Sequence, residues 1–414
     1  MEQYENRGVK KGLVILLVVI VAAASSLVTL AASRLYRTTS GGYYTVSEEY
    51  YDYLVRYKRL FEVESMLKEG HLYTASDEDF VNSAIKGLTG ALGDVYTRYM
   101  TSEEYEQVTQ DHNGVMVGVG ILMSTDAEDS LVTVVRVYPN TPGEAAGVRK
   151  GDKVIAVDDR VVTDMSLSDV ADLMRGEAGT QVKIDVLRDG EMVPIRITRD
   201  QFEVDRVTAK TFDNIGYIQI TEFTGNAKDR FMEELDRFVE AGVSGLVIDL
   251  RDNPGGYVTD VCEMTDRLLP EGTIVYTQDR DGKQEVMESD ADYVDLPIAV
   301  LVNGNSASAS EIMSGALQDY GRATIIGTTT YGKGLVQITV PFTSDGAALK
   351  YTFAQYFTPK GRNINGIGIE PDIYIEQEPV EGNALLITDD QDTQLQKALD
   401  VLRTQISGGT TETE

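Results

Sequence analysis

The sequence predicts an α/β domain with a mixed sheet and flanking helices, preceded by a smaller β-rich domain, a helical region and an N-terminal transmembrane helix. Three observations predict this class. Apolar runs alternate with amphipathic helical patterns after residue 199, valine-rich segments with glycine turns fill residues 107–199, and residues 12–32 carry no charge. We divide the chain into 1–11 (cytoplasmic N-terminus), 12–33 (membrane anchor), 43–106 (helical region), 107–199 (β-rich domain), 200–378 (α/β domain) and 379–414 (acidic segment with a short helix).

The uncharged run near the N-terminus is long enough to cross a bilayer, which takes about 20 residues of helix. Arg7, Lys10 and Lys11 precede it and Arg34 and Arg37 follow it, a slight bias that favours an inside N-terminus. The small residues at 30–33 leave a cleaved signal peptide as the alternative, although the run exceeds the usual apolar core of about 7–15 residues. We therefore expect a single-pass cell-membrane protein with its domains on the extracytoplasmic side.

Composition restricts the partners. The formal net charge of −30 repels phosphate backbones and argues against nucleic acid. The single cysteine, Cys262, cannot form an internal disulfide, so the domains must be held by core packing. Metal-ligand spacings are absent, and we expect neither a metal nor an organic cofactor.

The β-rich domain contains, in order, a strand pattern with paired glycines, a Pro-containing turn, a second strand and a short helix (115–121, 139–143, 151–157 and 168–174). This order resembles a PDZ domain. The resemblance implies that the loop of Gly118, Val119, Gly120 and Ile121 offers backbone N–H groups to the terminal carboxylate of a peptide, which adds as a strand to the sheet edge. Met116 replaces the bulky aromatic residue common before this loop, and glycines in a strand can also mark a simple bulge.

Within the α/β domain, the run 298–302 reads as a strand, the segment 306–311 (Ser-Ala-Ser-Ala-Ser-Glu) as a sharp turn, and the residues after it have helical spacing. Small residues in such a turn let a serine hydroxyl stand clear at a helix N-terminus, where free N–H groups favour developing negative charge. The pattern suits a nucleophilic serine. The simpler interpretation is that Ser306 or Ser308 only caps the helix.

A Ser-His-Asp triad is excluded by the histidine count, because the only two histidines, His71 and His112, lie far upstream of the serines. A lysine can replace histidine as the base if burial keeps its amine neutral. The candidate is Lys333, whose flanking glycines allow neighbouring backbone to approach and exclude water, which lowers a lysine pKa. A solvated turn lysine is the alternative.

A third motif follows the central strand 245–250: Arg251-Asp252-Asn253-Pro254-Gly255-Gly256. Paired glycines between a strand and a helix expose backbone N–H groups with the geometry of an oxyanion hole, although an ordinary turn would also use them. Together with Ser-Ala-Ser-Ala-Ser-Glu, Gly-Lys-Gly-x-x-Gln and the PDZ-like domain, this segment resembles the carboxyl-terminal processing, or tail-specific, proteases over about residues 76–377.

The resemblance implies a role for each matching residue. Ser308 would be the nucleophile, Lys333 the general base and Gln337 its support, since residues four apart on an extended strand share one face. The backbone N–H groups of Ala309 and one turn glycine, for which we choose Gly255 over Gly256, would bind the oxyanion. Arg175 matches an arginine that couples PDZ occupancy to the active site in some members, and a surface arginine at a helix end is the alternative.

We therefore expect a membrane-anchored serine endopeptidase that recognises protein C-termini through its PDZ domain and cleaves peptide bonds by a Ser-Lys mechanism. Its partners would be proteins or peptides with accessible C-termini. The alternative from another class is a catalytically inactive PDZ scaffold on a protease fold. A cytoplasmic peptide-degrading relative is a further alternative, which the predicted anchor disfavours.

The C-terminal segment also predicts assembly. Leu395, Ala398, Leu399 and Leu402 form one apolar face on a short helix, which alone would be marginal in water and needs a partner surface. Members of the resembled family often dimerise through their terminal regions. We therefore expect a homodimer.

Overall fold

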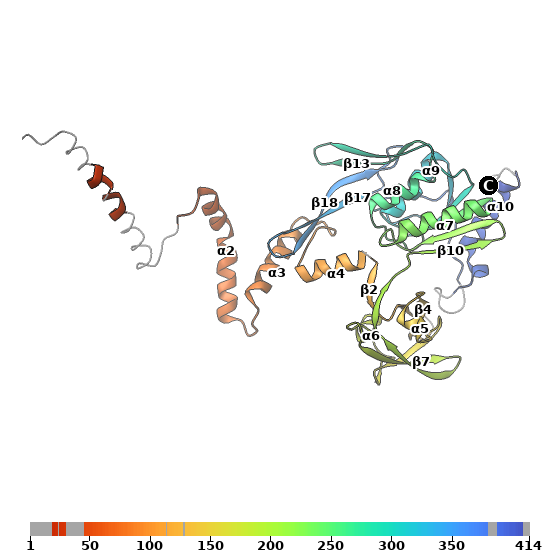
Figure 1. The fold of residues 1–414 in the computed structure, drawn as a ribbon, viewed down its shortest axis with the longest axis horizontal. Coiled ribbons are helices and arrows are strands. Elements are labelled where there is room, and N and C mark those ends of the chain that lie inside the picture. The colour runs from red at the N-terminus through yellow and green to blue at the C-terminus, as the bar shows by residue number, and fades with distance from the viewer. Residues whose placement is uncertain are drawn as a thin grey trace, which may run out of the picture. The chain divides into compact units, whose positions relative to one another are not determined.

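The computed structural model describes residues 19–23, 25–29, 45–112, 114–126, 129–379 and 387–408 (Figure 1). The chain divides into two compact units, Met1–Ser83 and Ala84–Glu414. The predicted cytoplasmic segment 1–11 and most of the predicted anchor 12–33 lie outside the described residues, although 19–23 and 25–29 are helical. Among the described helices, none is both long and apolar enough to cross a membrane.

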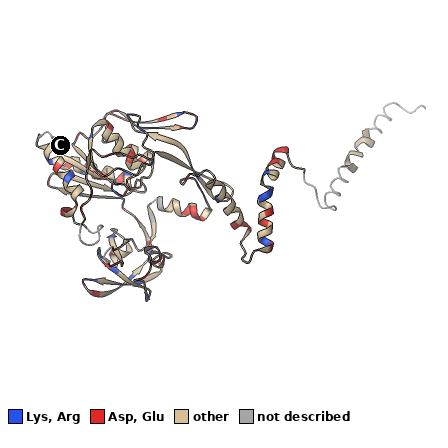
Figure 2. Ribbon diagram, turned by 180° about the vertical axis from the view of Figure 1, so that it is seen from behind, with Lys and Arg blue, Asp and Glu red and all other residues tan. Residues whose placement is uncertain are grey.

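The region predicted to be helical contains α2 (Glu48–Gly70), α3 (Asp77–Gly90) and α4 (Ser102–His112). Helix α2 begins at the Ser47 cap, whose hydroxyl accepts the N–H of Tyr50, and it buries no residue. Acidic and basic residues are both present along it (Figure 2), and Glu64 and Lys68 form an ion pair one turn apart. The region also holds a short strand, β1 (Arg98–Met100), which the sequence analysis did not predict.

The β-rich domain is built from two sheets. One has the order β3-β4-β5-β7-β8, with β6 beside β5, and the other pairs β2 with β9. The elements are β2 (Val115–Gly118), β3 (Ile121–Thr125), β4 (Val132–Val137), α5 (Pro142–Ala145), β5 (Lys153–Val157), β6 (Arg160–Val161), α6 (Leu167–Met174), β7 (Gln181–Arg188), β8 (Glu191–Thr198) and β9 (Asp200–Glu203). Inward-facing Val134, Val154, Val170 and Ile184 form its core. Strand β3 lies at the edge of its sheet.

The main sheet of the α/β domain has the order β10-β11-β12-β15-β16-β19. Only β10 and β11 pair antiparallel, so the sheet is mixed as predicted. Its strands are β10 (Val207–Phe212), β11 (Ile215–Ile220), β12 (Gly245–Asp249), β15 (Ile298–Val302), β16 (Ala323–Gly327) and β19 (Ile373–Tyr374). The central strands β12 and β15 are buried along their whole length, which explains their nearly continuous apolar sequences.

Helices cover both faces of this sheet. Leu246 and Ile248 of β12 pack in one core with residues of α7 (Ala227–Ala241), α8 (Val258–Asp266) and α9 (Ala309–Tyr320). Val247, which points to the opposite face, packs in another core with α10 (Thr393–Ile406) (Figure 1). The strand alternation therefore separates two cores across one sheet.

A second sheet, with the order β1-β18-β13-β14 and β17 beside β18, completes the domain. Its remaining strands are β13 (Gly272–Asp279), β14 (Gln284–Ser289), β17 (Leu335–Pro341) and β18 (Ala348–Phe357). Strand β18 pairs with β1 through Arg98 and Lys350 and with β17 through Thr339 and Lys350. The three strands bring residues from distant parts of the sequence into one row.

The inference that the apolar face of the C-terminal helix takes part in a dimer contact is wrong. Leu395, Ala398, Leu399 and Leu402 of α10 are buried against Val247 and its neighbours on the main sheet. The apolar face therefore finds its partner surface within the same chain, and it no longer supports a homodimer.

We predict that Leu399→Ala lowers the free energy of unfolding by about 2–5 kcal/mol, because it removes a buried side chain and leaves a cavity. Denaturant unfolding measures this loss. Lys397→Ala, at an exposed position of the same helix, is the matched control and should change stability by less than about 0.5 kcal/mol. Equal stability of the two variants would contradict the packing described for α10.

Candidate active site

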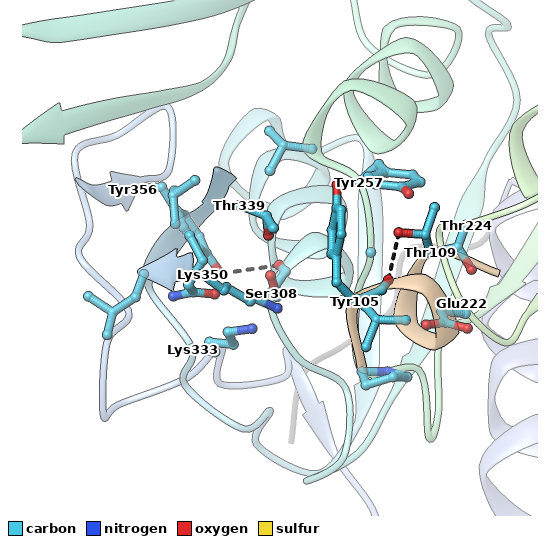
Figure 3. A pocket seen from close by; sticks show the side chains of 18 residues that line it. Tyr105, Thr109, Glu222, Thr224, Tyr257, Ser308, Lys333, Thr339, Lys350 and Tyr356 are labelled. Carbon is cyan, nitrogen blue, oxygen red and sulfur yellow. Dashed lines mark hydrogen bonds between the residues drawn. The ribbon is translucent and has the colours of Figure 1, made fainter. Parts of the chain in front are cut away.

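The turn after β15 distinguishes the three serines of its motif. The buried hydroxyl of Ser306 donates to the carbonyl of Leu250 at 2.8 Å, and that of Ser310 donates to the carbonyl of Asn253 at 2.9 Å. Both are therefore used to hold the turn together. Ser308, between them, lines a cavity of about 460 Å³ (Figure 3).

The backbone of Ser308, at the start of α9, has φ 57° and ψ −112°, a conformation that residues other than glycine rarely adopt. A non-glycine residue in such a region costs free energy and persists only where its surroundings enforce it. Two hydrogen bonds to the backbone around Ser308 enforce this conformation. The N–H of Ala307 donates to the carbonyl of Asn253, and the side-chain hydroxyl of Tyr356 donates to the carbonyl of Ser308 at 3.1 Å. The turn therefore presents Ser308 to the cavity.

Lys333 lines the same cavity, and the ring of Tyr96 lies 4.9 Å from its Nζ. Burial lowers the pKa of Lys333, the positive charge of Lys350 lowers it further, and the negative charge of Glu311 opposes both effects. A lysine with a lowered pKa is more often neutral and so better able to accept a proton.

The glycines flanking Lys333 allow the close backbone approach that the sequence analysis expected. A Cβ on Gly332 would lie 2.9 Å from the backbone nitrogens of Ile367 and Gly368, and one on Gly334 would lie 2.7 Å from that of Asn365. Because Gly332 also has φ +86°, a larger residue there would be strained as well as crowded.

Glu311, which the sequence analysis did not single out, joins the two candidate residues. Its buried carboxylate accepts the N–H of Ser308 at 2.8 Å, the N–H of Lys333 at 2.9 Å, the N–H of Gly332 at 2.7 Å and the hydroxyl of Thr330 at 2.6 Å. Four donors match the acceptor capacity of an ionised carboxylate. One side chain therefore holds the serine turn and the lysine loop together.

Gln337 lines the cavity, but the reasoning that placed it on one strand face with Lys333 is wrong. Lys333 precedes β17, and the pairing of β17 with β18 shifts between Val336 and Gln337. The alternation of side chains along a regular strand therefore does not put Lys333 and Gln337 on one face, although both line the cavity. The amide of Gln337 donates to Thr352 Oγ1 at 3.2 Å.

The choice of Gly255 as an oxyanion donor does not agree with the structure. Its N–H donates to Asn253 Oδ1 at 2.9 Å in a buried position. Among the hydrogen bonds of the described residues, none uses the N–H of Gly256 or of Ala309. Gly255 instead supplies space, because a Cβ on it would lie 2.8 Å from Ser308 Cβ. The N–H groups of Ala309, which follows Ser308 in the chain, and of Gly256, which lines the Ser308 cavity, are thus left available.

The turn that contains these glycines is anchored by a buried ion-pair network. Arg251 Nη2 lies 2.6 Å from Asp249 Oδ2 and 2.8 Å from Asp392 Oδ2 at the start of α10, and Tyr217 donates to Asp249 at 2.7 Å. Burial alone would raise the pKa of Asp249, but Arg251 holds it below its usual range. The network connects the C-terminal helix to the turn.

Other cavity residues come from segments that the sequence analysis did not connect with the site. They are Tyr105, Val108 and Thr109 of α4, Glu222 and Thr224 after β11, Tyr257 before α8, and Lys350 and Tyr356 of β18. Figure 3 shows Ser308, Lys333 and Lys350 toward one end, and Tyr105, Thr109 and Glu222 toward the other. Polar side chains thus lie at both ends.

In the PDZ-like domain, the loop Gly118–Ile121 leads into edge strand β3. Gly120 has φ +73°, and a Cβ on it would lie 2.2 Å from Thr141 Cβ, so only glycine fits. Val119 is buried, and Ile121 packs against the core that contains Met174 of α6. The loop and the helix thus lie beside one core.

The arginine expected to report peptide binding is exposed. Arg175, at the end of α6, forms an ion pair with Asp172 of the same helix, and 71% of its side chain is accessible. The buried arginine at this helix end is Arg199, which donates to the carbonyls of Met174 at 2.8 Å and Leu173 at 3.3 Å. Arg175 is not among the residues that line the Ser308 cavity.

No group of three or more His, Cys, Asp or Glu residues in the described part of the chain could hold a metal ion.

Comparisons with known proteins identify the class. The family model of Peptidase family S41 matches residues 214–375, and that of the PDZ domain matches residues 133–188. Fold and site thus define a peptidase-family chain with a PDZ domain. The chain belongs to the carboxyl-terminal-processing proteases of family S41, as its sequence motifs predicted.

Similar relatives cover most of the chain. A carboxyl-terminal-processing protease of Synechocystis is 36% identical over 77% of this chain and 76% of its own, and one of Bartonella bacilliformis is 37% identical over 80% and 77%. Among solved structures, a photosystem II D1 C-terminal processing protease matches with TM-score 0.50 and 31% identity over 76% of this chain and 86% of its own. A putative S41 protease from Bacteroides fragilis matches with TM-score 0.58 and 15% identity over 82% and 96%, a similarity of fold alone.

We predict that Glu311→Gln severely reduces peptide hydrolysis. The amide presents N–H groups to donors that need acceptors, and two buried N–H groups left unpaired cost about 2–6 kcal/mol in total. Any remaining activity should extend to lower pH, because losing the negative charge of Glu311 lowers the pKa of Lys333. Steady-state rates across pH measure both effects. Parent-like rates with an unchanged pH profile would show that Glu311 holds neither segment.

Proposed function

We propose that this chain is a serine endopeptidase in which Ser308 is the nucleophile and Lys333 the general base. The observation that carries the proposal is the placement of these two residues on one cavity. Ser306 and Ser310 use their hydroxyls on backbone carbonyls, whereas Ser308 faces the cavity with a lysine whose pKa is lowered by burial.

In the proposed reaction, Ser308 Oγ attacks the carbonyl carbon of the scissile bond and its proton passes to the neutral amine of Lys333. The tetrahedral intermediate collapses as the C–N bond breaks, and Lys333 returns the proton to the leaving amine. A water molecule then attacks the acyl-enzyme with Lys333 again as base, which releases the new carboxyl end and restores Ser308.

The backbone N–H groups of Ala309 and Gly256 are the proposed oxyanion donors. Ala309 follows Ser308 in the chain and Gly256 lines the Ser308 cavity, and the described hydrogen bonds use neither N–H group, whereas Gly255 donates to Asn253. One such donor is worth about 3–4 kcal/mol of the barrier. Gln337, whose amide donates to Thr352, would support the wall of the cavity beside Lys333.

The PDZ domain would deliver substrates by binding protein C-termini. The carboxylate would meet the backbone N–H groups of Gly118–Ile121, and the peptide would add to the exposed edge of β3. Arg175 would report occupancy through a charge-assisted hydrogen bond after leaving Asp172. Gating requires that the bound peptide favours the active arrangement by differential affinity.

The N-terminal run 12–33 would anchor the enzyme in the cell membrane, with its catalytic part on the extracytoplasmic side. Its uncharged length and the positive charges before it support this placement. A cleaved signal peptide would export the same domains without anchoring them. The substrates proposed for this location are proteins or peptides with accessible C-termini.

An inactive PDZ scaffold is the competing function, and the first test separates the two. We predict that the parent hydrolyses an unstructured protein and that Ser308→Ala abolishes the cleavage. Lys333→Ala and Lys333→Arg should be equally inactive while folding normally, because a guanidinium cannot give up its proton at working pH.

The pH dependence follows from the same lysine. Hydrolysis should rise with pH through the pKa of Lys333, which burial and Lys350 place below that of an exposed lysine. Substantial turnover by Lys333→Arg, or a rate that is flat across this limb, would remove Lys333 as the base.

A separate prediction concerns the proposed control of the peptidase site by peptide binding to the PDZ domain. Arg175→Ala should lower cleavage of a protein with a PDZ-binding tail far more than cleavage of a short peptide without one. It should not weaken tail binding to the full chain in proportion. If binding and cleavage fall together, Arg175 only binds the peptide. If neither changes, it is a surface arginine.

A further inference from the structure

The cavity contains a second lysine that the proposed reaction does not use. Lys350 of β18 lies directly opposite Thr339 of the neighbouring strand β17. Both residues line the cavity that contains Ser308 (Figure 3). Its other cross-strand neighbour is Arg98 of β1. Strands β1 and β18 therefore place two positive charges side by side, and that of Lys350 lies in the same cavity as Ser308.

Lys350 has no ion pair among the described residues, although the chain has 67 acidic residues and only 37 basic ones. Most other described lysines pair with an Asp or Glu, among them Lys153, Lys183 and Lys228. Lys350 is also partly buried, and this burial, followed by the charge of Arg98, lowers its pKa. A cation removed from water without a counter-ion costs free energy that a bound anion would recover.

We propose that Lys350, together with the hydroxyl of Thr339, binds a carboxylate of the substrate close to the scissile bond. The proposal rests on the proposed peptidase function and adds a preference among substrates. An ammonium and a hydroxyl can both donate hydrogen bonds to a carboxylate, and the charge on the lysine strengthens its bond.

The opposite end of the cavity favours the same orientation of substrate. Glu222 lies there, paired with Arg206 at 3.0 Å, so among the described residues that line that end a negative side chain of the substrate meets a carboxylate and no unpaired cation. The carboxylate could belong to an acidic side chain or to the free C-terminus of a short tail. Both share the chemistry that Lys350 recognises.

The test uses the full chain and three short peptides that share one cleavage site. One carries a glutamate next to the scissile bond and an amidated C-terminus, the second is neutral with a free C-terminus close to the scissile bond, and the third is neutral and amidated. Rates are compared for the parent, Lys350→Met and Lys397→Met, the last being an exposed lysine on α10.

The parent should show a higher kcat/KM on the glutamate peptide, the free-acid peptide or both than on the amidated neutral peptide. Lys350→Met should reduce that preference by about tenfold or more, as expected for one charge-assisted hydrogen bond, and Lys397→Met should retain it. The peptide whose advantage disappears identifies the source of the carboxylate.

Lys350 also affects Lys333 through its charge, so binding is measured separately. In the Ser308→Ala background, which removes chemistry, Lys350→Met should weaken binding of the preferred peptide about tenfold relative to the neutral one. Peptide preference that survives Lys350→Met, or a parent without any preference, overturns the proposal. If the parent hydrolyses neither the peptides nor an unstructured protein, the proposed peptidase function itself is contradicted.

Discussion

The buried carboxylate of Glu311 contacts both halves of the candidate site. It accepts hydrogen bonds from the backbone of Ser308 at the start of α9 and from the backbone of Gly332 and Lys333 in the loop before β17. A buried carboxylate is costly unless its oxygens are satisfied, so the two segments stabilise Glu311 as much as it positions them. The same charge raises the pKa of Lys333, which burial and Lys350 lower.

The layers of the domain bring these segments within reach of one side chain. Parallel strands β12 and β15 end beside each other, so the turn after β12 and the serine turn after β15 meet at one edge of the sheet. Asn253 connects them, accepting the N–H of Ala307 and the hydroxyl of Ser310 on its carbonyl and the N–H of Gly255 on its side chain. Arg251, paired with Asp392, ties this edge to the C-terminal helix.

The family, the mixed sheet and the strand, turn and helix around Ser308 could be predicted from the sequence because they depend on local patterns. The spacing of apolar residues and the glycines beside Lys333 carry that information. Glu311, Lys350 and Tyr356 were missed because their roles depend on contacts between segments far apart in the chain. Glu311 had one visible signal, its position three residues after Ser308, which is that of a capping box.

Two errors have the same origin. Gly255 and Gly256 are equivalent in sequence, and only the side chain of Asn253 shows which N–H is occupied. The apolar face of α10 was correctly located, but its partner surface is the main sheet of the same chain, which a pattern along one helix cannot reveal. In both cases the sequence showed the group that needs a partner, a backbone N–H or an apolar helix face, but not the residue or surface that it contacts.

The most direct test of the account is to map where an acylating or phosphonylating serine reagent reacts. The full chain is treated across a range of pH, digested, and its labelled peptides are identified by mass spectrometry. We predict labelling of Ser308, without Ser306 or Ser310, at a rate that rises with pH along the same limb as peptide hydrolysis. Labelling of a different serine, or labelling of Ser308 that does not depend on pH, would contradict the assignment of a Ser308 nucleophile activated by Lys333.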